Sequence, residues 1–159
     1  MRLSALLFPL VISGCGYRPG TLKLPERCPA SGELRTAGCL DFAVCPFRDP
    51  EAEGPAVAIA FANRCDQAVK VDLGALKATG LLRDGRRVAM TAYDPDGELR
   101  PAKLDARREG RENIEYQVPT HIAERPVTLC LDFSGVDAGA DEPRPVIACV
   151  RSTATHASQ

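Results

Sequence analysis

From residue 57 the chain reads Val57-Ala58-Ile59-Ala60-Phe61-Ala62-Asn63-Arg64-Cys65-Asp66-Gln67-Ala68-Val69-Lys70-Val71. In its first half, the large apolar residues Val57, Ile59 and Phe61 alternate with alanines, and residues 69–73 alternate between apolar and charged side chains. A period of two is typical of β-strands, because successive side chains of a strand point to opposite faces. The polar cluster at 63–67 favours a turn. The segment therefore predicts two antiparallel strands joined by a short turn.

The same period recurs along the rest of the chain. Further strands are predicted at 40–44, 76–82, 87–93, 98–104, 114–118, 127–133 and 144–151. Asp84-Gly85 is a strong hairpin signal, and Pro101 restricts the 98–104 strand to an edge or a bulge. No segment beyond the first 15 residues has a helical period over ten or more residues. The sequence therefore predicts an all-β fold, a single antiparallel β-sandwich of about 7–9 strands.

Two segments are similar to parts of bacterial immunoglobulin-like domains. In residues 58–71, as in those domains, an apolar strand ends in an Asn, a polar turn follows, and a Val-x-Val strand returns. Residues 110–118 resemble a late strand of such domains, which often begins with a Gly-Glu-type turn. The Cys…Trp…Cys core of antibody domains is absent, because the chain has no Trp. The resemblance implies a small exported immunoglobulin-like sandwich, and it concerns architecture rather than activity.

The first 15 residues have the pattern of an export signal. Arg2 and the α-amino group are positive, residues 3–12 are almost wholly apolar, and small residues follow. The apolar run is shorter than the roughly 20 residues that a membrane-spanning helix needs.

The end of this signal, Ile12-Ser13-Gly14-Cys15, resembles the lipobox of bacterial lipoproteins. In that family the cysteine receives a diacylglycerol, the peptide is cut before it, and the new N-terminus is usually acylated, for example with palmitate. The resemblance implies that residues 1–14 are removed and that Cys15 anchors the protein to a membrane. In that family an aspartate after the cysteine often retains the protein at the inner membrane, so Gly16 in this position implies the outer membrane. The alternative is an ordinary signal peptide, with Cys15 as one more disulfide partner.

The remaining chain divides into three parts. Residues 15–27, with two prolines and two glycines after the cysteine, are expected to be a flexible tether. Residues 28–151 are expected to form the sandwich, with a cysteine-rich segment at 28–50 that is loop-like except for the strand at 40–44. The polar residues 152–159 are expected to be a disordered tail.

The chain has seven cysteines, and six remain when Cys15 is set aside. These six are Cys28, Cys39, Cys45, Cys65, Cys130 and Cys149. An even number of cysteines in an exported chain predicts three disulfides. A metal site is not expected, because there is no CxxC pair and neither histidine is near a cysteine in sequence.

The strand pattern favours one disulfide. Cys130 and Cys149 each alternate with apolar residues, so both are expected to point away from the core and to meet across a hairpin. The other four cysteines would then tie residues 28–50 to the strand that ends at Cys65. The alternative is a link between the two sheets from Cys65 to Cys130, as in antibody-type domains.

Composition excludes several function classes. The chain has 20 basic and 21 acidic residues, so a strongly basic nucleic-acid-binding protein is not expected. With no Trp and only 5% aromatic residues, a platform for stacking sugars or bases is not expected. Phosphate-binding glycine loops and cofactor motifs are absent, so no cofactor is expected.

Three short features remain as candidate sites. Asp94-Pro95-Asp96-Gly97-Glu98 resembles the start of a calcium loop but lacks the later ligands, so a plain turn is expected. The mixed-charge run 107–112 could bind an acidic partner or lipid headgroups, although a solvated loop is expected. His121 could act as a general base, but no Gly-x-Ser-x-Gly elbow accompanies it, and an exposed loop position is expected.

The sequence predicts a membrane-anchored envelope lipoprotein with a non-enzymatic binding or structural role toward an envelope protein. Two alternatives stay open. An inhibitor or adaptor module for an exported protein would bind through a loop such as 134–143. An envelope enzyme would need a nucleophile or a carboxylate within reach of His121.

Overall fold

The computed structural model describes residues 16–25, 28, 33–47, 52–136 and 146–152. Within these ranges the chain is all-β, and its one helical turn is a short 3-10 helix, η1 (Leu73–Ala75). The predicted signal peptide 1–14, Cys15 and most of the tail 152–159 lie outside the described residues. No described helix is long and apolar enough to cross a membrane.

Ten strands occur in the described residues. They are β1 (Arg35–Ala37), β2 (Leu40–Phe47), β3 (Ala56–Asn63), β4 (Val69–Val71), β5 (Lys77–Leu81), β6 (Arg87–Ala92), β7 (Ala102–Leu104), β8 (Glu109–Gln117), β9 (Thr128–Asp132) and β10 (Ile147–Arg151). Eight of them are hydrogen-bonded in the order β1-β2-β3-β8-β6-β5-β9-β10, and β4 pairs with β7 separately. All the pairings are antiparallel.

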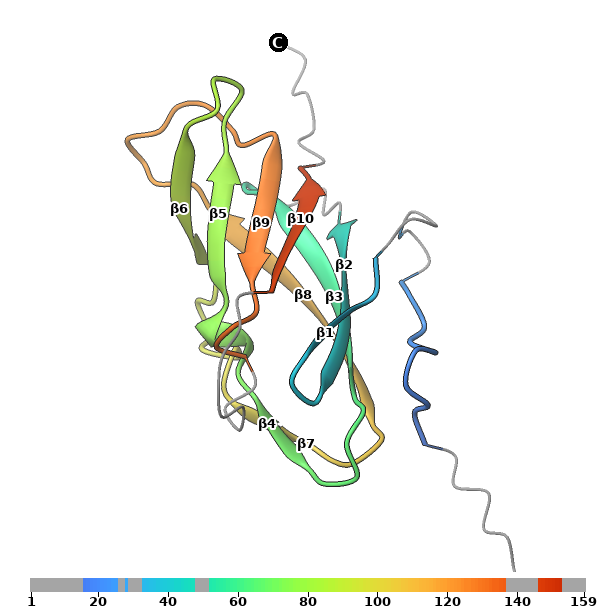
Figure 1. Ribbon diagram of the computed structural model, residues 1–159. Helices are drawn as coiled ribbons and strands as arrows, with labels where there is room; N and C mark the ends of the chain where they lie inside the picture. Colours follow the sequence, from blue (N-terminus) through green and yellow to red (C-terminus); the bar gives the residue numbers. More distant parts are fainter. Residues whose placement is uncertain (1–15, 26–27, 29–32, 48–51, 137–145, 153–159) are drawn as a thin grey trace, which may run out of the picture.

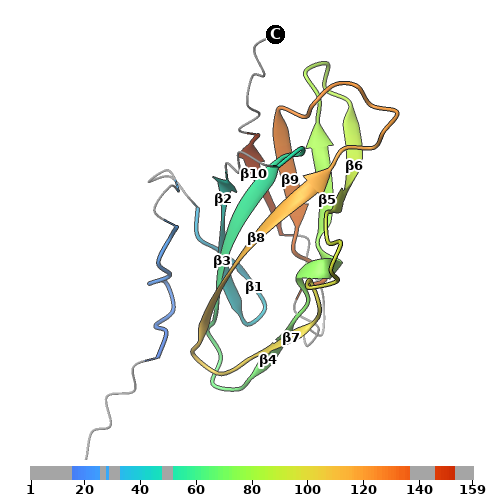
Figure 2. The ribbon, with the colours of Figure 1, turned by 180° about the vertical axis from the view of Figure 1, so that it is seen from behind.

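The eight strands form two facing layers, because β6 and β8 are joined by only two residue pairs. One layer contains β1, β2, β3 and β8, and the other contains β6, β5, β9 and β10, as Figures 1 and 2 show from opposite sides. The rows β2-β3-β8 and β6-β5-β9-β10 correspond to the A-B-E and C′-C-F-G rows of immunoglobulin domains, with β6 beside β5 as C′ lies beside C in the variable type. The fold is therefore an immunoglobulin-like sandwich, as the sequence predicted.

The core lies between the two layers and follows the predicted alternation. Val57 and Ile59 of β3 face Leu129 and Leu131 of β9 across a single cluster of buried side chains. Phe42 of β2 stacks on Phe133, which follows β9, with ring centroids 3.7 Å apart. Such a stacked pair contributes about 1 kcal/mol beyond its buried area. The stack therefore joins the two layers.

The turns confirm some predictions and correct others. The Asp84-Gly85 signal forms the β5–β6 hairpin, in which Gly85 adopts φ +85°. The strand predicted at 98–104 begins only after Pro101, and it pairs with β4 outside the main sheet. The segment 28–50 is not loop-like where it is described, because it contains β1 and the eight-residue strand β2.

Candidate functional site

Strands β2 and β3 are buried on both faces over most of their length. Leu40, Phe42 and Val44 point into the core, so the residues between them face outward. Six outward-facing residues of the two strands are at most 8% exposed. They are Asp41, Ala43, Cys45, Ala58, Ala60 and Ala62. A solvent-facing sheet would leave such residues exposed, so another part of the chain must cover them.

The N-terminal segment 16–25 runs alongside β1 and β2 and covers part of this face (Figures 1 and 2). Tyr17 bonds to Asp41 of β2, Arg111 of β8 donates to the Lys23 carbonyl at 3.3 Å, and Cys28 is disulfide-bonded to Cys45 of β2. The short alanine side chains of β3 leave room for the segment to lie against the sheet. The expectation of a free tether over 15–27 is therefore wrong at Tyr17 and Lys23.

Tyr17 is the most deeply placed residue of this segment, with only 6% of its surface exposed. Its backbone N–H donates to the Arg107 carbonyl at 2.6 Å, and its hydroxyl donates to Asp41 Oδ2 at 2.7 Å. The Gly20 N–H donates back to both the Tyr17 hydroxyl and Asp41 Oδ2. Burial and the hydrogen bond to Asp41 raise the pKa of Tyr17 to about 12. The phenol is therefore neutral at physiological pH and acts as a donor.

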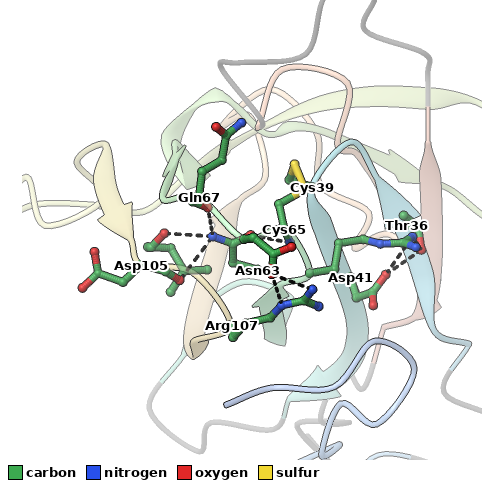
Figure 3. Close-up of a disulfide and its surroundings, with 11 residues drawn as sticks. Thr36, Cys39, Asp41, Asn63, Cys65, Gln67, Asp105 and Arg107 are labelled. Atoms are coloured by element: carbon green, nitrogen blue, oxygen red, sulfur yellow. Dashed lines mark hydrogen bonds and ion pairs between the residues drawn. A yellow bond between two sulfur atoms is a disulfide. The ribbon is translucent and has the colours of Figure 1, made fainter. Parts of the chain in front are cut away.

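Asp41 is a buried carboxylate, 2% exposed, with several donors around it (Figure 3). Besides Tyr17 and Gly20, Thr36 donates its hydroxyl at 2.7 Å and the Arg64 guanidinium lies at 3.6 Å. Burial alone would raise the pKa of Asp41, but these donors and the Arg64 charge lower it below its ordinary value of 3.8. Asp41 is therefore ionised, its carboxylate oxygens have hydrogen-bond donors, and it holds Tyr17 in place.

Hydrogen bonds of a single side chain also connect the turns next to Asp41 (Figure 3). The Asn63 amide is fully buried and donates to the carbonyls of Gln67, Leu104 and Asp105, and its oxygen accepts from the Cys65 N–H. These contacts join the turn after β3 to the end of β7. One side chain thus closes the end of the sandwich at which Tyr17 is held.

Arg107 completes this end of the molecule. It is the only described non-glycine residue with a positive φ, +59°, and its guanidinium pairs with Asp66 at 2.8 Å. The run 107–112 is not a loop throughout, because its residues from Glu109 belong to β8 and Arg107 holds Tyr17 through its carbonyl. Its charged residues at 108, 109, 111 and 112 are exposed to solvent, as expected. We call the cluster of Tyr17, Asp41 and Arg107 the N-terminal latch.

The six cysteines expected to form disulfides do so in the structure. The pairs are Cys28–Cys45, Cys39–Cys65 and Cys130–Cys149. Cys130 lies directly opposite Cys149 in the β9–β10 register, which is the arrangement favoured from the strand pattern. The alternative link from Cys65 to Cys130 is wrong, because Cys65 is bonded to Cys39.

The other candidate features have simpler roles. Both carboxylate oxygens of Asp94 accept backbone N–H groups, from Glu98 and Leu99, so the Asp94 segment is a turn. No group of three or more potential metal ligands occurs in the described part of the chain. His121 is exposed and lines an open groove to which no described carboxylate, serine, threonine or cysteine contributes. The loop 134–143 is described only as far as Val136.

Comparison of this chain with protein-family models, with curated proteins and with solved structures gives no match.

The N-terminal latch predicts a specific dependence of stability on acid. Because the pKa of Asp41 is lower in the folded than in the unfolded chain, its stabilisation is complete above pH 3.8 and is lost as the pH falls through the folded pKa. We expect the free energy of unfolding to drop as the pH falls below about 4, and the Asp41→Asn variant to show a shallower drop. Urea unfolding followed by circular dichroism across this range measures it.

Asp84→Asn is the matched control for this experiment. The pKa of Asp84 is also lowered, by hydrogen bonds from Arg86, but this ion pair is exposed and screened by water. The Asp84→Asn variant should keep the parent pH dependence. A drop that is equally steep in the parent and in Asp41→Asn would contradict the role given to Asp41.

Proposed function

We propose that the protein is an envelope lipoprotein, anchored to the outer membrane through Cys15, whose sandwich has a non-enzymatic binding role toward another envelope protein. The three disulfides support a place outside the cytoplasm, because disulfides persist in oxidising compartments. The lipobox-like Ile12-Ser13-Gly14-Cys15 supports the anchor. Two or three acyl chains would hold the protein stably, where a single chain gives only marginal binding.

The observation that carries the proposal is the position of Tyr17. Tyr17 is held by Asp41 and by the Arg107 carbonyl, and it lies two residues after Cys15. Two residues span at most about 7 Å. The fold therefore begins directly after the residue that would carry the lipid, and a cut before Cys15 would leave the latch complete.

This position also gives the anchored domain a defined orientation. Tyr17 lies at the end of the molecule that carries β4 and β7, whereas the β5–β6 turn and the β8–β9 connection lie at the opposite end (Figure 1). An acyl anchor at Cys15 would hold the first end at the bilayer surface. The opposite end would then point away from the membrane, where a partner protein could reach it.

Metabolic labelling with radioactive palmitate in the cells that make the protein tests the anchor. We expect label in the parent protein and none in Cys15→Ala, because the other six cysteines are held in disulfides. Ser13→Ala is the matched control, since it keeps a small residue in the lipobox, and it should label like the parent. Label that persists in Cys15→Ala, or a parent protein without label, would overturn the proposed anchor.

A further inference from the structure

Strand β6 is paired with a different neighbour along each part of its length. It pairs with β5 from Arg87 to Met90, but with β8 only at Thr91 and Ala92. Strand β8 ends at Gln117, and the continued register would place Pro119 opposite Ala89. Proline has no N–H to donate, so the pairing of β6 with the chain after β8 cannot continue past this point.

The register shows which backbone groups are left at this edge. The Leu82 N–H donates to the Arg86 carbonyl, so the pairs that alternate with it, Gly80 with Val88 and Ala78 with Met90, are hydrogen-bonded. The residues between them point their N–H and C=O groups away from β5. These residues are Arg87 and Ala89, and in the described part of the chain no partner faces them.

An open groove of about 430 Å³ lies along this edge. One wall is β6 from Arg87 to Ala89, and the other is the start of the β8–β9 connection, with Pro119 and His121. Figures 1 and 2 both show this connection passing on the outer side of β6. Because Arg87 and Ala89 are two residues apart in an extended strand, their free groups have the spacing of a β-ladder. The groove thus presents a short, unoccupied strand position.

The charge of the groove favours an acidic occupant. Arg87 is exposed and has no ion pair within the described residues, and no carboxylate lines the groove. Arg86 lies beside it, although its guanidinium is shared with Asp84. His121 stands on the opposite wall, where it could donate a hydrogen bond.

We propose that this groove binds an extended segment of a partner protein as an added strand on β6, with an acidic side chain of that segment next to Arg87. Strand addition gives affinity through main-chain hydrogen bonds and specificity through side chains at alternate positions. The inference deepens the binding role proposed above and rests on it, but it does not depend on the lipid anchor. The groove lies at the end of the sandwich opposite the N-terminal latch, so an anchored protein would keep it accessible (Figure 1).

The test uses a displayed library of random octapeptides, selected on the full protein as extracted from cells. We expect selected peptides that are rich in β-branched residues and contain Asp or Glu. Binding of a selected peptide should fall about tenfold or more in Ala89→Pro, which removes one free N–H without removing a β5–β6 hydrogen bond. Ala89→Ser keeps the N–H and is the matched control, with unchanged binding. Arg87→Gln should weaken the acidic peptides selectively.

N-methylation of the selected peptide keeps the test decisive if Ala89→Pro fails to fold. Methylation at every second residue should abolish binding, and methylation of the residues between should not. Binding that is insensitive to the position of the methyl group, or a library that yields no binder, would overturn the proposal. So would a dimer formed through β6, because the occupant would then be a second copy of this chain. Loss of palmitate label would contradict only the anchor, so the two failures can be distinguished.

Discussion

Tyr17→Ala should lower the free energy of unfolding by about 3 kcal/mol. The substitution removes an aromatic side chain that is 6% exposed, and it removes a hydrogen bond to an ionised carboxylate. Loss of a large buried side chain typically costs about 3–5 kcal/mol, and the position of Tyr17 near the end of the chain favours the lower value. Tyr17→Phe keeps the ring and should cost about 1.5–2 kcal/mol, the share of the charged hydrogen bond. Urea unfolding with the disulfides intact, followed by circular dichroism, measures both variants.

Tyr93→Ala is the matched control for this prediction. Tyr93 is 49% exposed, so its removal should change the free energy of unfolding by no more than about 0.5 kcal/mol. If Tyr17→Ala were as mild as Tyr93→Ala, the segment around Tyr17 would be a free tether after all. This result would contradict both the N-terminal latch and the orientation of the anchored domain that depends on it.

Removal of the Cys39–Cys65 disulfide should cost about 3.5 kcal/mol. The two cysteines are 26 residues apart, and the value follows from the chain entropy that such a link removes from the unfolded state. The link joins the turn after β1 to the turn after β3, next to the Asn63 contacts (Figure 3). The double variant Cys39→Ala with Cys65→Ala should therefore unfold at a clearly lower urea concentration than the parent.

Cys15→Ala is the control for the loss of a cysteine as such. In the proposed scheme Cys15 takes part in no disulfide, so this variant should unfold like the unlipidated parent. Equal urea midpoints for Cys15→Ala and for the double variant would show that the Cys39–Cys65 link adds nothing to stability. Ellman titration without reductant shows whether each variant keeps the remaining disulfides.

The main architecture could be predicted from the sequence because it depends on local patterns. Alternation at Val57, Ile59 and Phe61, and again at Leu129 and Leu131, identifies strands with one face in the core. Turn chemistry at Asp84-Gly85 identifies the β5–β6 hairpin. The strand pattern also favoured the Cys130–Cys149 pair, because a hairpin brings neighbouring strands together without long-range information.

The N-terminal latch could not be predicted in this way. An alternating pattern shows that Ala58, Ala60 and Ala62 share a face, but it does not show what covers that face. Tyr17 and Asp41 are 24 residues apart and are joined by no local pattern. A signal was nevertheless present, since a solvent face of an antiparallel sheet is normally polar and alanine is depleted in strands, so a face made almost wholly of alanine indicates that something covers it.

The unpaired edge of β6 could not be predicted from the sequence for a different reason. Whether Ala89 has a hydrogen-bond partner depends on which strand lies beside β6, and that strand comes from later in the chain. From the sequence alone, Pro119 is only one residue of the connection between two predicted strands. Its effect on the edge becomes visible once the β6–β8 register places it opposite Ala89.

Intact mass spectrometry of the protein from its native membrane tests the central claim most directly. Thiols are alkylated before reduction in one sample and after reduction in another. We expect a chain that begins at acylated Cys15, with no alkylated cysteine before reduction and six afterwards. An unmodified chain cut elsewhere, with a seventh cysteine that can be alkylated, would contradict it.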